Sequence, residues 1–147
     1  MTLALNVEDL ALNVEELSDY LSEVFPEVWE DFAIDALTRD TVNVRLLTDD
    51  RHLRPGGTVS GPSMFALADV AVYAMVLARV GRKALAVTTN CSIDFMRKPE
   101  ANRDLIAQCR LLKLGRALAV GDVLLFSEGS DKPVAHATLT YSIPPRG

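Results

Sequence analysis

The sequence predicts a single α+β domain in which an antiparallel sheet of about six strands wraps around one long apolar helix, with an extra helix at the N-terminus. Three observations predict this class. Residues 62–80 are apolar on all sides, so a helix formed there needs cover over most of its circumference. Two short alternating segments precede it, and four strand-like segments follow it. The chain of 147 residues has room for one such domain.

The N-terminal part predicts an amphipathic surface helix. Over residues 14–25, apolar side chains recur at helical spacing with acidic groups between them, and Pro26 is expected to end the helix. Residues 3–8 are nearly repeated at 10–16, which we interpret as a local duplication without chemistry at a frayed start. Residues 1–29 are therefore predicted to be a helical extension of a domain formed by residues 30–147.

Strands are predicted on both sides of the long helix. Residues 34–47 alternate apolar and polar side chains around a turn at 39–40, which predicts a hairpin with one buried face. After the helix, alternation or β-branched composition marks residues 85–96, two strands within 105–127, and residues 134–143. We expect these last four strands to form an antiparallel meander.

The first strand after the helix has unlike faces. Strict alternation places Val87 and Cys91 on the apolar face, and Thr88 on the opposite face with Asn90. The sequence thus predicts a strand with one buried side and one polar side.

The start of the long helix follows a loop, residues 48–61, that combines charges, a proline and three glycines. Pro62 suits the first helical position, and Ser60 or Gly61 is expected to cap the helix. Within the helix, Asp69 is the single charged residue between Gly56 and Ala78. An ionised carboxylate removed from water is costly unless it is paired or protonated, so Asp69 indicates either chemistry or a structural bond to a hydroxyl such as that of Thr88.

Charge and cysteine content exclude several classes. The net charge is −5 without a basic stripe, so we expect no nucleic-acid partner. Cys91 and Cys109 lie in no metal or disulfide pattern, so we expect no metal. Asp69 and Arg79 interrupt the long apolar segment, and the first residues do not read as a signal peptide. We therefore expect a cytoplasmic protein without a membrane span.

The segment GTVSGPSMFALADVA, together with the following VTTNCSIDFMRKP, resembles the hotdog-fold acyl-CoA thioesterases, in particular the phenylacetate-degradation (PaaI-like) branch. The resemblance spans roughly residues 30–143. That family commonly reads Asn-x-x-Gly-x-x-His-Gly-Gly, with a helix Asp nine positions after the His. Here the corresponding positions hold Arg54 for the Asn, Gly57, Ser60 for the His, Gly61, Pro62 and Asp69.

The resemblance implies thioester hydrolysis, with Asp69 as general base or nucleophile, the Gly61 amide as oxyanion donor and Thr88 as an assisting hydroxyl. Asp69 lies eight positions after Gly61, about 12 Å along a helix, so one carbonyl cannot easily touch both within one subunit. The family places its sites between subunits, which implies a homodimer, and pairs of dimers are common. Coenzyme A would be part of the substrate, and no separate cofactor is expected.

Further residues are candidates for contacts with an acyl-CoA substrate. Arg97 and Lys98 are suited to CoA phosphates, and Arg54 to a phosphate or a substrate carboxylate, although each could equally be a solvated cation. The remaining candidates are His52, more simply an exposed loop histidine, Ser60 and Pro62 at the helix start, and Asn90 in the strand.

Two other functions stay open. Because Arg54 and Ser60 replace the family Asn and His, the chain could be a non-catalytic acyl-CoA binding or regulatory module. A hydratase on the same fold is less favoured, because the loop before the helix lacks an Asp-x-x-x-x-His pair.

Overall fold

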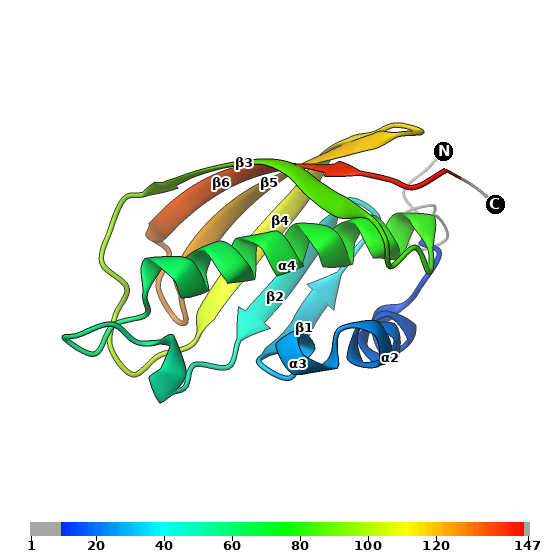
Figure 1. Ribbon diagram of the computed structural model, residues 1–147. Helices are drawn as coiled ribbons and strands as arrows, with labels where there is room; N and C mark the ends of the chain where they lie inside the picture. Colours follow the sequence, from blue (N-terminus) through cyan, green and yellow to red (C-terminus); the bar gives the residue numbers. More distant parts are fainter. Residues whose placement is uncertain (1–9, 146–147) are drawn as a thin grey trace.

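A six-stranded antiparallel sheet curves around one long helix, α4 (Gly61–Val80), in the computed structural model, which describes residues 10–145 (Figure 1). The predicted fold class is confirmed. The strands are β1 (Phe32–Leu37), β2 (Thr41–Leu46), β3 (Val87–Phe95), β4 (Leu105–Leu114), β5 (Leu118–Ser127) and β6 (Pro133–Ser142). The hairpin formed by β1 and β2 has its turn where the sequence predicted it.

The order of the strands corrects the predicted four-strand meander. The sheet runs β1-β2-β4-β5-β6-β3, so β4, β5 and β6 form a meander, but β3 pairs with β6 at the far edge. The other side of β4 is occupied by β2, with Val42 opposite Cys109. Alternation of side chains determines which face a strand buries and not which strand lies beside it, and so the crossover from β3 to β4 was missed.

Helix α4 forms the centre of the core. Twelve of its residues are buried, from Met64 to Ala78. By length and composition it could cross a membrane, but 67% of that window is buried inside the protein, as in the core helix of a soluble domain. The helix begins at Gly61, one residue before the expected position, and Ser60 caps it by accepting the Ser63 N–H at 3.3 Å.

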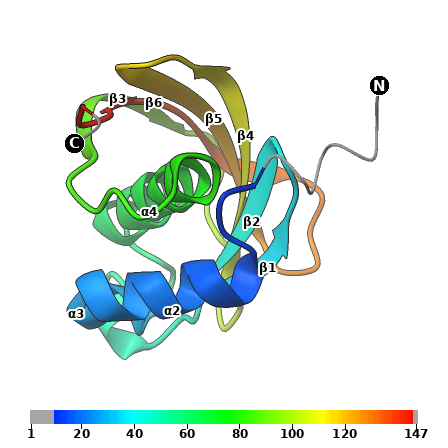
Figure 2. The ribbon, with the colours of Figure 1, turned by 90° about the vertical axis from the view of Figure 1, so that its right-hand side faces the viewer.

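The N-terminal extension packs against this core. Helix α2 (Val14–Val24) starts with a capping box between Asn13 and Glu16 and buries Leu17 and Leu21. Pro26 does not simply end this helix, because it opens a second short helix, α3 (Pro26–Trp29), where its fixed φ is suited to the first turn. Figure 2 shows α4 between the curved sheet and α2. The first copy of the duplicated segment, residues 3–8, lies outside the described residues, and the second copy, residues 10–16, runs into α2.

A β-bulge in β3 changes which side chains face α4. Thr88 pairs with Tyr141 and Asn90 with Thr140, so Thr89 is an extra residue in the strand. One extra residue reverses the alternation, and Thr88 therefore faces the helix on the same side as Cys91. The predicted assignment of Thr88 to the opposite face was wrong for this reason.

Candidate active site

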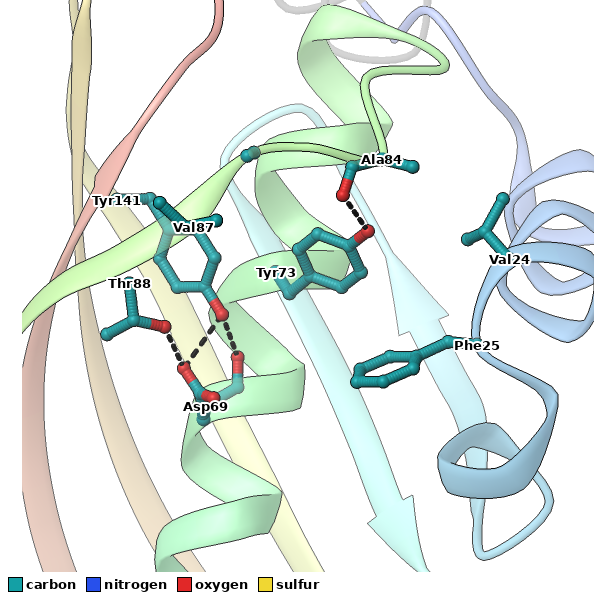
Figure 3. A pocket seen from close by; sticks show the side chains of 9 residues that line it. Val24, Phe25, Asp69, Tyr73, Ala84, Val87, Thr88 and Tyr141 are labelled. Atoms are coloured by element: carbon teal, nitrogen blue, oxygen red, sulfur yellow. Dashed lines mark hydrogen bonds between the residues drawn. The ribbon is translucent and has the colours of Figure 1, made fainter.

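The Asp69 carboxylate lies in the middle of α4, facing β3 and β6 (Figure 3). Its Oδ1 accepts a hydrogen bond from the Thr88 hydroxyl at 2.6 Å and another from the Tyr141 hydroxyl at 2.7 Å. The Tyr141 hydroxyl also lies 3.1 Å from the backbone carbonyl oxygen of Asp69. Both donors meet Oδ1, and no described residue donates to Oδ2. The carboxylate is thus oriented through one oxygen, while the other is available to a ligand.

Tyr141 stays protonated in this position. Burial, and then the charge of Asp69, raise the pKa of Tyr141 well above its usual range, so the phenol can donate at neutral pH. Its ring stacks on Tyr73, with ring centroids 5.9 Å apart. Tyr141 was not among the predicted site residues. A signal existed, because a tyrosine on the buried face of a strand needs a partner for its hydroxyl, and Asp69 is the one acid of the apolar helix.

A cavity of about 290 Å³ adjoins the carboxylate, and we call it the carboxylate cavity. Its walls come from the end of α2, from α4, from the segment before β3 and the start of β3, and from β6. The lining residues are Val24, Phe25, Asp69, Tyr73, Ala84, Ala86, Val87, Thr88 and Tyr141. Apart from Asp69 and the hydroxyls, these walls are apolar and aromatic, which suits an apolar group attached to a polar reacting centre.

The start of α4 carries an amide that is free to donate. The Ser60 N–H donates to the His52 carbonyl at 2.8 Å, and Pro62 has no N–H. The Gly61 N–H meets no acceptor among residues 10–145. Because helix starts combine unpaired N–H groups with the positive end of the helix dipole, the Gly61 N–H can donate a hydrogen bond to an anionic oxygen.

A second cavity, of about 420 Å³, lies at this helix start, and we call it the basic cavity. It brings together four of the predicted site residues, namely Arg54, Gly61, Arg97 and Lys98. The three cations are exposed, and none forms an ion pair with another described residue. Apolar side chains, including Phe95 and Met96, complete the walls. This composition suits a ligand with anionic groups on an apolar body.

His52, predicted as a substrate contact or an exposed loop residue, is buried outside both cavities. Its Nδ1 accepts the Asp49 N–H at 2.9 Å, and its Nε2 lies 3.2 Å from an Asp31 carboxylate oxygen. Burial, and then the charge of Arg51, lower the pKa of His52. His52 therefore anchors the loop whose backbone holds Ser60 and does not face a ligand.

Three other predicted residues line neither the carboxylate cavity nor the basic cavity. Pro62 and Asn90 are exposed, and Ser60 caps α4. Among residues 10–145, no group of three or more His, Cys, Asp or Glu side chains could hold a metal ion. The predicted site residues that do line a cavity thus lie in the carboxylate cavity or the basic cavity.

The comparisons with known proteins agree with this architecture. A family model described as the thioesterase superfamily matches residues 56–134, more than half of the chain. The protein belongs to the thioesterase superfamily, and the predicted resemblance to hotdog-fold thioesterases is confirmed. No relative was found among curated proteins.

Solved structures give more detailed likenesses. A candidate thioesterase from Silicibacter sp. TM1040 is 67% identical, with a TM-score of 0.87, and the match covers 92% of this chain and 94% of that one. A mutant of the phenylacetic acid degradation protein PaaI from Thermus thermophilus is 28% identical, with a TM-score of 0.69, over 81% and 99% of the two chains. A hypothetical thioesterase from Streptococcus pneumoniae TIGR4, solved with coenzyme A, shares the fold at 20% identity and a TM-score of 0.73, over 88% and 98%.

Proposed function

We propose that this protein is an acyl-CoA thioesterase, which hydrolyses its substrate to a free acid and coenzyme A. The observation that carries the proposal is the Asp69 carboxylate, fixed through Oδ1 by two hydroxyls and presenting Oδ2 beside an apolar cavity. A general base must be oriented and must keep a lone pair free to accept a proton, and this carboxylate meets both conditions.

In the proposed reaction, Asp69 Oδ2 takes a proton from the water that attacks the thioester carbonyl. The carbonyl oxygen becomes an oxyanion, and the Gly61 N–H of a second copy donates to it. Collapse of the tetrahedral intermediate breaks the carbon–sulfur bond, and the CoA thiolate takes up the proton. Asp69 could instead attack the carbonyl directly and form a mixed anhydride. After a single turnover in ¹⁸O-water, label in Asp69 would identify direct attack followed by addition of water to the Asp69 carbonyl carbon, whereas addition of water at the acyl carbon labels the product acid on either route, so that result is resolved by trapping the anhydride with hydroxylamine.

The basic cavity is proposed to bind the CoA part of the substrate. Arg54, Arg97 and Lys98 present three cations next to the Gly61 amide, and charged donors of this kind bind phosphate groups. The S. pneumoniae protein of the same fold was solved with coenzyme A, which motivates this choice of ligand.

A homodimer is the proposed working unit. Gly61 and Asp69 line different cavities that share no residue, so a single copy offers two incomplete halves. Strand β3 is an edge of the sheet, and Val87, Phe95 and Met96 on or next to it are more than half exposed. An unpaired apolar edge is a template for a second strand. We propose that two copies join there and that dimers pair into tetramers.

The test is a panel of acyl-CoA thioesters assayed by release of the free thiol, with Asp69→Asn as the matched variant. We expect wild-type turnover and a loss of at least about 100-fold in the variant, since general bases contribute 10²–10⁴ in rate. Equal turnover by both proteins would exclude Asp69 as the base. Binding of acyl-CoA without any turnover would support the non-catalytic module, which the replacement of the family Asn and His by Arg54 and Ser60 favours.

A further inference from the structure

We propose that Phe25, from the N-terminal extension, is a specificity-determining residue that limits the length of the acyl group. This inference rests on the proposed function, because it assigns the carboxylate cavity to the acyl group. The extension is outside the segment matched by the family model, which begins at residue 56.

The residues of the carboxylate cavity lie in a defined order. Asp69 occupies one side, the Tyr73 ring lies in the middle, and Phe25 lies on the opposite side, as Figure 3 shows. The Phe25 ring meets Tyr73 edge to face, with centroids 5.9 Å apart and an interplanar angle of 77°. An acyl group whose carbonyl is held at Asp69 would therefore run past Tyr73 and end against Phe25.

The backbone holds the Phe25 ring in place. Phe25 joins α2 to α3, and its N–H donates to the Leu21 carbonyl at 2.9 Å. Its own carbonyl accepts from the Val28 N–H at 3.2 Å and from the Trp29 N–H at 2.8 Å. Because Trp29 is buried, this corner is anchored to the core. Phe25 itself is 41% exposed, so removing its ring would open the cavity to solvent and would not leave a closed void.

The extension also fixes the middle of the cavity. The Tyr73 hydroxyl donates to the Ala84 carbonyl at 2.8 Å, and the Ala84 N–H donates to the Tyr20 hydroxyl of α2 at 3.2 Å. Ala84 is thus bonded from the core helix on one side and from the extension on the other. With Tyr73 and Ala84 fixed in this way, a change at Phe25 alters the far wall and leaves the region near Asp69 in place.

The experiment measures kcat/KM for straight-chain acyl-CoA thioesters of about four to sixteen carbons. We expect Phe25→Ala to move the optimum to longer chains and to raise the ratio of long-chain to short-chain kcat/KM at least about tenfold, since one methylene in an apolar pocket is worth roughly 10- to 200-fold. Phe25→Trp, which keeps an aromatic side chain, is expected to move the optimum to shorter chains. Val14→Ala is the control, because Val14 is similarly exposed on α2 but does not line the cavity.

Failure of this inference is distinguishable from failure of the proposed function. If the wild type turns over thioesters and the profiles of wild type, Phe25→Ala and Phe25→Trp superimpose, Phe25 does not set chain length. The same acyl-CoA series is titrated by calorimetry into Asp69→Asn and into the double variant Asp69→Asn/Phe25→Ala. The dependence of Kd on chain length is then measured without turnover. A shift of that dependence to longer chains in the double variant supports the inference even if hydrolysis is absent, and identical dependences overturn it.

Discussion

The two cavities along α4 differ in how their polar groups are satisfied. In the carboxylate cavity, Thr88 and Tyr141 both donate to the same oxygen of Asp69, so the proposed base is oriented before any ligand binds. In the basic cavity, the side chains of Arg54, Arg97 and Lys98 find no anionic partner among the described residues, and the Gly61 N–H finds no acceptor there. The polar groups of the first cavity bond to one another, whereas those of the second are available to a charged ligand from outside the chain.

This contrast fits separate tasks for the two cavities in the proposed reaction. A fixed carboxylate suits proton transfer, which depends on orientation. Solvated cations suit the attraction of a multiply charged ligand and contribute to binding with little demand on geometry. Substitutions in the two cavities should therefore affect kcat and KM differently, and the following experiments test that difference.

The largest effect is expected from mixing two inactive variants. Asp69→Asn loses the base, and Gly61→Pro loses the oxyanion donor, so each alone should fall at least about 100-fold in kcat. If each site takes Gly61 from one copy and Asp69 from the other, random mixing makes half of the dimers mixed, each with one complete site. We expect recovery of up to about a quarter of wild-type activity.

The proline variant is compatible with its position. A Cβ at Gly61 would meet the Phe95 ring at 3.6 Å, an ordinary contact, and proline is tolerated at the first helical residue. Gly61→Ala keeps the N–H and serves as the control. Absence of recovery in mixtures that exchange subunits would place both groups in the same copy's site.

The next effect concerns Tyr141. Tyr141→Phe leaves Thr88 as the only described donor to Asp69 Oδ1, so the carboxylate loses orientation, and we expect kcat to fall roughly tenfold with little change in KM. The free energy of unfolding should fall by about 1 kcal/mol, measured in urea, because a buried hydrogen bond is lost. Tyr20→Phe removes a hydroxyl bonded to Ala84, and it should match the stability loss without the loss in kcat.

A smaller effect is expected at the basic cavity. Arg97→Ala combined with Lys98→Ala should raise KM for acyl-CoA about two- to thirtyfold with kcat unchanged, since exposed ion pairs contribute roughly 0.2–1 kcal/mol each. Thioesters of N-acetylcysteamine lack the CoA phosphates and should not respond. Lys113→Ala, on an exposed cation of β4, is the matched control. An equal rise of KM for both substrate types would indicate that these cations do not meet phosphates.

The smallest effect is a dependence of stability on pH. The folded chain holds the pKa of His52 below the ordinary value of 6.5, so below that value the unfolded chain binds a proton that the folded chain resists. The stabilisation is complete above pH 6.5 and is lost as the pH falls toward the lowered pKa. We expect the urea concentration at the unfolding midpoint to decrease as the pH is lowered from about 7 to about 5, and to decrease less in His52→Gln. If the midpoint decreases equally with pH in the wild type and in His52→Gln, the decrease comes from carboxylates and not from His52.

Much of this fold and part of the site could be predicted from sequence. The apolar run with one acid marked α4 and Asp69, and turn residues marked the strand ends. The sequence predicts Arg54, Arg97 and Lys98 as substrate contacts and Gly61 as an oxyanion donor, and all four line one cavity. These successes come from local patterns, in which composition and spacing determine the structure within a few residues.

The remainder depends on contacts between distant segments. Tyr141 lies 72 residues from Asp69 in the sequence, and the alternation of its strand does not distinguish it from other residues on the buried face. Phe25 closes a cavity beside a helix that starts at Gly61, so the predicted division at residue 29 separated groups that lie together. The buried position of His52 likewise depends on Asp31, which no local pattern connects to it.

The extra residue Thr89 in β3 determines how related sequences align with this one. Thr88 and Asn90 oppose Tyr141 and Thr140, which are neighbours in β6, so a strand without the bulge keeps a residue opposite Tyr141 and facing Asp69 only if it lacks the residue at 89. A sequence alignment of such a strand without a gap at residue 89 would pair residues of opposite orientation on one side of the bulge.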